Sequence, residues 1–106
     1  MATIANSVML IGIMQDAIFD DEQKAVQFRL EVNEQVKQED GKWKEEKSEF
    51  MCYAKGRLYN RLLVPNREGK KIALEGRLIS KRTQGNTFES LFMVFVEVDD
   101  FFPIDR

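Results

Sequence analysis

Apolar and polar residues alternate along several separate stretches of this chain, and the alternation limits what it can fold into more than any other feature. In residues 26–33 every second residue is apolar, the period expected of a β-strand that buries one face. Residues 70–81 and 87–98 repeat the pattern on either side of a Gln-Gly-Asn turn, which favours a hairpin. The sequence therefore predicts a protein built mainly of β-strands.

The N-terminal half adds a first strand and a charged hairpin. Residues 6–14 form an apolar run rich in branched side chains, with Gly12 at a position suited to a bend or bulge of a barrel strand. The polar residues 15–25 that follow are expected to form a loop. The highly charged segment 34–49 pivots on Asp40-Gly41, a strong hairpin signal. We expect an extended arm there.

Residues 50–55 alternate again, and their pattern predicts which side chains face the barrel interior. The small and apolar set is expected to point inward: Phe50, Cys52 and Ala54. Tyr53 then faces outward, and a one-residue slip of register would exchange it with Phe50. Phe28 and Phe92 are also expected in the core.

One short helix is predicted between the third and fourth strands, where Leu58 and Leu62 have helical spacing and Pro65 ends the pattern. Five strands with a helix in this position follow the chain order of the OB-fold, a Greek-key barrel that binds oligonucleotides or oligosaccharides across one sheet face. SH3-like barrels and other small β domains also contain five short strands. We predict an all-β protein with a single OB-fold domain over residues 1–106.

The residue types exclude most catalytic chemistry. The chain has no histidine and one cysteine, Cys52, which removes histidine-based catalysis, internal disulfides and cysteine-based zinc sites. The carboxylates fall mainly in charge-rich runs typical of a surface, so we expect a protein that is not an enzyme and has no cofactor. Apolar runs too short for a membrane helix and an N-terminus without the basic region of a signal peptide lead us to expect a cytoplasmic protein.

The net charge of −2 hides a strong asymmetry along the chain. Residues 1–49 hold 6 basic and 11 acidic side chains, a net −5; residues 50–88 hold 9 and 2, a net +7; residues 89–106 hold 1 and 5, a net −4. A basic middle within an acidic protein suggests a local site for an anion. The alternative is that these basic side chains only solvate a surface.

Four motifs, in order and at the right spacing, resemble the bacterial single-stranded DNA-binding protein family over nearly the whole chain. "NSVMLIG" followed by Asp16 resembles the opening motif of that family, and "VQFRLEVNE" resembles its second strand. "YAKGRL" is similar to the segment that leads into the family helix, and "IALEGRL" to the family pattern V-x-V-E-G-R-L. The resemblance implies an OB-fold, usually oligomeric, that coats single-stranded DNA in replication, recombination and repair.

The chain also departs from that family. Positions that carry base-stacking aromatic residues in the family correspond here to Val36, Lys55 and Thr83. Family members usually end in a long flexible tail with an acidic tip that recruits other proteins, whereas this sequence stops at Arg106 soon after its last predicted strand. We expect a short, tail-less member in which residues 99–106 close the barrel.

Binding of single strands requires cations that follow the phosphates and flat side chains that accept bases. Tyr53 is the best stacking candidate and Trp43, on the charged arm, is a second, whereas the strand parity of Phe88 fits the core better. With so few stacking residues, electrostatics is expected to dominate and to give a modest, strongly salt-dependent affinity. The predicted nucleic-acid-binding residues are Arg29, Trp43, Tyr53, Lys55, Arg77, Lys81 and Arg82.

The last strand bears on assembly, because its residues are apolar on both faces. The outward set is Leu91, Met93 and Phe95, and the alternate set is Phe92, Val94 and Val96. A strand without a solvent-facing side in so small a barrel argues for a homo-oligomer, either a dimer or a tetramer.

Two other functions stay open beside coating of single-stranded DNA. The first is an OB-fold interaction subunit of a replication complex, similar to the primosomal protein PriB, that docks a partner protein through Trp43 and the acidic arm. The second is an enzyme or small-ligand binder, which would require a concave pocket with a carboxylate in an apolar setting.

Overall fold

A computed structural model of the chain describes residues 5–63, 66–83 and 91–104, and within these ranges it contains five strands and one helix. Each strand is 13 residues long. The elements in chain order are β1 (Val8–Asp20), β2 (Ala25–Lys37), β3 (Trp43–Lys55), α1 (Arg57–Leu63), β4 (Lys71–Thr83) and β5 (Leu91–Pro103).

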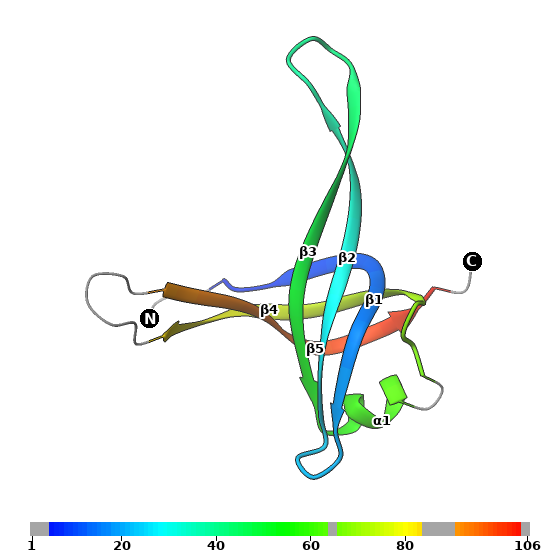
Figure 1. The fold of residues 1–106 in the computed structure, drawn as a ribbon, viewed down its shortest axis with the longest axis vertical. Helices are drawn as coiled ribbons and strands as arrows, with labels where there is room; N and C mark the ends of the chain where they lie inside the picture. The colour runs from blue at the N-terminus through cyan, green and yellow to red at the C-terminus, as the bar shows by residue number, and fades with distance from the viewer. Residues whose placement is uncertain (1–4, 64–65, 84–90, 105–106) are drawn as a thin grey trace.

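The five strands close into a barrel in the order β1-β2-β3-β5-β4 (Figure 1). The neighbouring pairs are antiparallel except β3 and β5, which meet in parallel through Cys52–Val96 and Tyr53–Glu97. The helix lies between β3 and β4 along the chain. The predicted five-stranded Greek-key OB-fold barrel with one short helix is therefore confirmed.

The first strand is longer than the sequence pattern predicted. The pattern predicts a loop over residues 15–25, but residues 15–20 continue β1 past an extra residue at Asp16, which shifts the strand parity. Asp16 takes a positive φ of 52°, and the bulge exchanges the inward set from even to odd positions. Beyond it Ala17 and Phe19 pack against the core. The side chain of Glu68 accepts a hydrogen bond from the Ala17 amide at 2.7 Å.

Of the bend or bulge that the pattern predicts at Gly12, the structure shows no bulge, and a close approach of two backbones explains the glycine. β1 pairs regularly with β4 through Ile13 and pairs with β2 from Ile13 onward. Gly12 is therefore next to the residue at which the strand changes partners. A Cβ atom at Gly12 would collide with the backbone carbonyl of Glu31, so only glycine lets the strands cross this closely.

The core lies inside the barrel, and the strand alternation predicted most of it. Phe28 and Cys52 are fully buried as expected, and Phe50 is partly buried against them. Tyr59 of α1 is buried although its helical spacing did not predict it, and its hydroxyl donates a hydrogen bond to Asp21 at 3.1 Å. The predicted core position Phe92 has no described side chain, and Phe88 lies outside the described residues.

Residues 99–103 complete β5, which confirms that this segment closes the barrel. Phe101 is buried in the core, and Pro103 is paired with Ile72 of β4. Arg61 of α1 reinforces the closure, because its guanidinium lies 4.6 Å from the Phe101 ring centroid and forms an ion pair with Asp100 at 3.0 Å.

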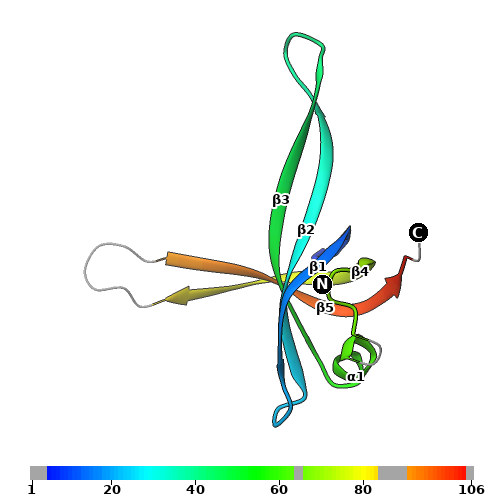
Figure 2. The same cartoon turned by 45° about the vertical axis from the view of Figure 1, so that its right-hand side comes forward.

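Two hairpins project beyond the barrel in different directions (Figures 1 and 2). The β2–β3 arm, residues 34–47, turns at Gly41, whose φ is +84° as the Asp-Gly signal predicted. The β4–β5 hairpin carries Leu78 and Val94 outside the barrel, where both are exposed. Within the described residues, no helix is long and apolar enough to cross a membrane.

Candidate nucleic-acid interface

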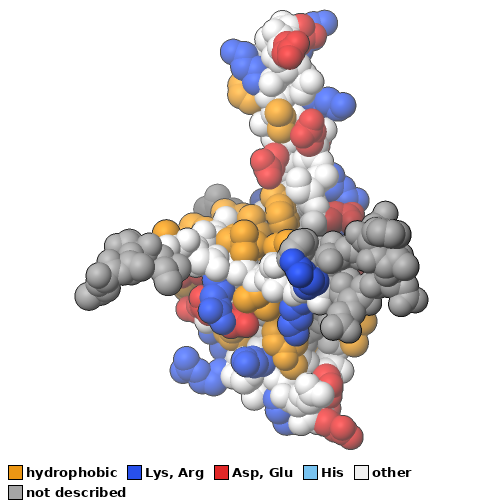
Figure 3. All heavy atoms as spheres, turned by 90° about the vertical axis from the view of Figure 1, so that its left-hand side faces the viewer, with side chains coloured by type: hydrophobic (Ala, Val, Ile, Leu, Met, Phe, Trp, Pro, Cys, Tyr) orange, Lys and Arg blue, Asp and Glu red, His pale blue; other side chains and the backbone are white. Residues whose placement is uncertain are grey.

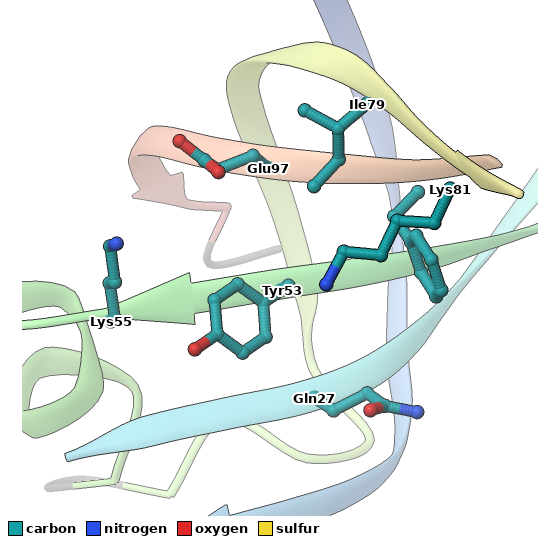
Figure 4. A pocket seen from close by; sticks show the side chains of 7 residues that line it. Gln27, Tyr53, Lys55, Ile79, Lys81 and Glu97 are labelled. Carbon is teal, nitrogen blue, oxygen red and sulfur yellow. The ribbon is translucent and has the colours of Figure 1, made fainter. Parts of the chain in front are cut away.

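A hollow of about 410 Å³ opens on the outward face of four neighbouring strands. Its centre is a row of register partners in which Gln27 of β2 is paired with Tyr53 of β3, and Tyr53 with Glu97 of β5. Figure 4 shows Tyr53 in the middle of this hollow, with Gln27 on one side and Lys81 extending toward its ring. The lining residues are Gln27, Tyr53, Lys55, Ile79, Lys81, Phe95 and Glu97.

A second hollow of about 260 Å³ adjoins the first, since Gln27 and Tyr53 line both. Its other lining residues come from the end of β1, the turn that follows and the start of β2: Ile18, Asp20, Gln23, Ala25 and Val26. Tyr53 is thus a ridge between two recesses. We call the two recesses together the Tyr53 groove.

The position of Tyr53 settles the register of β3. Cys52 and Ala54 are buried, and Tyr53 is on the opposite face, partly exposed. Phe50 faces the barrel interior, so the one-residue slip does not occur. Tyr53 therefore presents an aromatic ring to the groove, which is the arrangement that base stacking requires.

Two of the predicted cations line the Tyr53 groove without a counter-ion among the described residues. These are Lys55, at the end of β3, and Lys81, on β4. Arg77 is close by, but its guanidinium forms an ion pair with Glu97 at 3.2 Å. The positive charge available to a phosphate in this groove consequently comes mainly from the two lysines.

Arg29 faces outward as predicted, but three carboxylates surround its guanidinium. Nε donates to Asp16 at 2.9 Å, and Nη1 donates to Glu49 at 2.9 Å and to Glu31 at 3.4 Å. The Asp16 hydrogen bond is the largest cause of a raised pKa of Arg29. Lys47 lies 3.6 Å from both Glu31 and Glu49. We call these five residues the Arg29 cluster.

The structure separates two other predicted site residues from the Tyr53 groove. Trp43 begins β3 at the far end of the arm, where it is 65% exposed and paired with Lys37. Arg82 alternates with Lys81 and therefore belongs to the opposite face of the β4–β5 hairpin, with Leu78 and Ser80. Of the positions at which the resemblance implies stacking residues, Val36 is on the arm and Lys55 is in the groove.

Sequence reasoning missed four residues that line the larger hollow: Gln27, Ile79, Phe95 and Glu97. The apolar pattern of the last strand predicts a subunit contact for Phe95, yet Phe95 is paired with Ile79 and lines the larger hollow. Phe95 and Glu97 are two residues apart on β5 and therefore share the outward face, and this alternation could have identified Phe95 as a groove residue. On the face that Figure 3 shows, Lys and Arg side chains lie near apolar ones below the arm, whereas charges of both signs intermingle along the arm.

A closed five-stranded barrel with an aromatic, amide and cationic groove on its outward face defines an oligonucleotide-binding protein of the OB-fold class. The model of the single-strand binding protein family matches residues 5–101. The chain therefore belongs to this family, whose members bind single-stranded DNA and catalyse no reaction. No curated protein sequence matches the chain.

Solved structures of single-stranded DNA-binding proteins share the fold. A Plasmodium falciparum protein, solved in complex with single-stranded DNA, has a TM-score of 0.78 at 18% identity, with 98% of each chain covered. A small Streptomyces coelicolor protein has a TM-score of 0.69 at 17% identity, covering 92% of this chain and 93% of that one. A small Mycoplasma pneumoniae protein has a TM-score of 0.69 at 16% identity, with 97% of each chain covered.

Proposed function

We propose that this protein binds single-stranded DNA in the Tyr53 groove, with Tyr53 stacking on bases and Lys55 and Lys81 contacting phosphates. The observation that carries the proposal is the position of one partly exposed aromatic ring between two adjoining recesses, flanked by two lysines that have no counter-ion among the described residues. A base stacked on an aromatic side chain contributes about 1–3 kcal/mol, and any of the four bases can stack. Binding without sequence preference follows.

We assign the biological role by family membership. A non-enzymatic protein that sequesters single strands serves replication, recombination or repair, where such strands are exposed, and we place it in the cytoplasm. Partner proteins of these processes belong to the same proposal. The net charge of −2 makes nonspecific attraction to duplex DNA weak, so a local groove rather than the overall charge supports selectivity for single strands.

We also propose a homo-oligomer, and the structure offers an apolar face that supports it. Ile11 of β1 is paired with Ala73 of β4, which is paired with Phe102 of β5, so the three form a row on the outer side of the barrel. Ile11 is 50% exposed and Phe102 49%, and Met9 beside them is 69% exposed. A row of this kind is typical of a subunit interface.

Sedimentation of an Ile11→Glu/Phe102→Glu variant tests the assembly. We expect a smaller species than the wild type, because charges would be buried at the interface. Met93→Glu, on the projecting β4–β5 hairpin, tests the alternative apolar face of β5. Loss of assembly in Met93→Glu alone would move the interface to the hairpin, and a monomeric wild type would refute the oligomer.

Titration of fluorescently labelled oligo-dT at two salt concentrations, beside a duplex, tests the DNA-binding function. The wild type should bind the single strand alone. A Lys55→Gln/Lys81→Gln variant should bind more weakly and with a shallower salt dependence, by about 0.7 in the log–log slope for each phosphate that is no longer neutralised. Lys70→Gln/Lys71→Gln removes the same charge outside the groove and should have little effect. No binding by the wild type at low salt would refute the function.

The exposure of Trp43 favours one second candidate, an interaction subunit that docks a partner protein. The arm places a tryptophan that is 65% exposed at its far end, and tryptophan is enriched among residues that anchor protein interfaces. If the wild type failed to bind oligo-dT, this candidate would replace the first, and Trp43→Ala would be expected to abolish partner capture while Lys55→Gln/Lys81→Gln left it intact.

A further inference from the structure

The outward face of β2 and β3 runs without interruption from the Tyr53 groove to the tip of the arm. Its successive rows, given by the register, are Gln27–Tyr53, Arg29–Met51, Glu31–Glu49, Asn33–Lys47, Gln35–Glu45 and Lys37–Trp43. Trp43 belongs to the same face by alternation along β3. A DNA strand lying in the groove therefore has two ways to continue: along the β2–β3 arm toward Trp43, or along the β4–β5 hairpin past Lys81.

The Arg29 cluster occupies the first of these two routes. It begins one row from Tyr53 and contains three carboxylates, Asp16, Glu31 and Glu49, against two cations. The side chains of Arg29 and Glu31 are 27% and 19% exposed, so they form the partly buried centre of the cluster. An incoming phosphate meets a net negative charge here.

Arg29 cannot contribute its charge to DNA without a loss elsewhere. To bind a phosphate, the guanidinium would have to release Glu49 or Asp16, each now hydrogen-bonded at 2.9 Å. The released carboxylate would then face a polyanion with no cation of its own, and like charges brought together repel. The cation nearest to Tyr53 on this route is therefore neutralised by the fold.

The second route has the opposite character. Lys81 and Ile79 of β4 and Phe95 of β5 line it, and Lys81 has no counter-ion among the described residues. The single carboxylate lining the larger hollow, Glu97, is paired with Arg77 at 3.2 Å. Apolar surface and an available cation thus lie on the hairpin side of Tyr53.

We propose that the Arg29 cluster is an electrostatic barrier that keeps single-stranded DNA off the β2–β3 arm and confines it to a path over Tyr53 and along the β4–β5 hairpin. The proposal rests on the proposed function, because it concerns the route of the DNA that the groove binds. It assigns the cluster a role in setting the path and length of the bound strand, in addition to its contacts between β1, β2 and β3.

The test variant removes carboxylates of the barrier, and a control variant makes the same charge change on the other face of the same arm. Glu31→Gln/Glu49→Gln deletes two carboxylates of the cluster, so that Lys47 loses both of its partners and Arg29 keeps only Asp16. The net charge of the cluster changes from negative to positive. Glu34→Gln/Glu46→Gln deletes a second pair that is also directly opposed across β2 and β3, but on the opposite face by alternation. The two variants carry the same charge change on the same two strands.

Binding of oligo-dT is measured as a function of salt, and the occluded site is measured with poly-dT. We expect Glu31→Gln/Glu49→Gln to bind roughly three- to tenfold more tightly at low salt, with the log–log slope steeper by about 0.7 for each additional phosphate that the protein neutralises. Its occluded site should lengthen, and DNA should quench the fluorescence of Trp43, the single tryptophan. The control variant should match the wild type.

Equal behaviour of the two double variants overturns the barrier, whether both resemble the wild type or both bind more tightly through net charge alone. A wild type that does not bind oligo-dT overturns the proposed function as well, so the two failures are distinguishable. Glu49→Gln alone, at a side chain that is 48% exposed, provides a milder variant if the double substitution unfolds the protein, and it should shift affinity and slope in the same direction by less.

Discussion

Asn6 makes two hydrogen bonds with the backbone of Leu78, donating from Nδ2 to the carbonyl at 2.8 Å and accepting from the amide at 2.9 Å. The last regular pair between β1 and β4 is Val8–Gly76. The side-chain amide of Asn6 therefore continues the hydrogen-bonding pattern between β1 and β4, with its own atoms in place of backbone atoms. This explains why a polar residue stands just before the apolar start of β1.

Asn6→Ala should lower the free energy of unfolding by about 1 kcal/mol, the typical net value of exposed hydrogen bonds lost without a buried orphan group. Urea denaturation measures the difference. Asn6→Asp should also destabilise, because a carboxylate cannot donate to the Leu78 carbonyl. Ser7→Ala, at the exposed neighbour, is the control. Equal stability of wild type and Asn6→Ala would show that the two bonds contribute nothing net.

Much of the fold followed from strand periodicity, because inside a barrel every second side chain must be apolar. The alternation of residues 26–33 correctly predicted a buried Phe28 and Leu30. The alternation failed as a guide at Asp16. The extra residue there reverses which positions of β1 face inward, so a pattern with a constant period of two predicts that the strand ends at this point. At the bulge, the Ala17 amide donates a hydrogen bond to Glu68, which lies far away in the sequence, and no local pattern contains that contact.

Cys52 should be inert toward thiol reagents in the folded protein. Burial raises the pKa of its thiol to about 12, so the reactive thiolate is nearly absent at pH 8. We expect labelling by an aromatic disulfide at pH 8 to be at least about a hundredfold slower than in urea-unfolded protein, measured by absorbance. The native rate should rise in proportion to the unfolded fraction as urea is added. Fast labelling without denaturant would contradict the buried position of the thiol.

Asp100 should make the barrel sensitive to acid. The hydrogen bond from Arg61 and then the Phe101 amide lower the pKa of this carboxyl below its usual value. A group with a lowered folded-state pKa contributes stability above its unfolded-state pKa, near 3.9 for aspartate, and loses it as the pH falls through the folded value. The melting temperature should therefore drop as the pH is lowered from about 5 to 3.

The Asp100→Asn variant isolates that contribution. Its melting temperature at pH 7 should be lower than that of the wild type, and its decline between pH 5 and 3 should be shallower. A decline remains because Lys24 and Tyr59 likewise lower the pKa of Asp21. Asp99→Asn, at the exposed neighbour, should keep the wild-type pH profile. Parallel profiles for Asp100→Asn and wild type would contradict the role of the Arg61 ion pair.

The candidate site was less predictable than the fold, because charges depend on neighbours that strand register brings together. Arg29 and Lys81 look alike in the sequence as outward cations on strands. The register places Arg29 beside Glu49 of β3 and Asp16 of β1, whereas Lys81 lines the groove. The alternation within β3 is enough to predict that Tyr53 faces outward. Phe95 was missed because its place in the groove depends on the strands beside β5.

Substitution of Tyr53 should weaken DNA binding strongly, because its ring is the proposed stacking surface. Tyr53→Ala removes the ring between the two recesses, and with it about 1–3 kcal/mol of stacking, so affinity for oligo-dT should fall by roughly 5- to 150-fold. Because stacking does not neutralise a phosphate, the salt slope should stay close to that of the wild type. This separates it from Lys55→Gln/Lys81→Gln, for which the slope itself becomes shallower.

Tyr53→Phe provides the matched variant, since it keeps the ring and deletes only the hydroxyl. Near-wild-type affinity for Tyr53→Phe together with a large loss for Tyr53→Ala, measured by the same titrations, identifies stacking as the contribution. An equal loss in both variants would instead assign the effect to a hydrogen bond from the hydroxyl. If neither substitution changed the affinity, DNA would have to lie away from the ridge at Tyr53, and the groove would no longer explain binding.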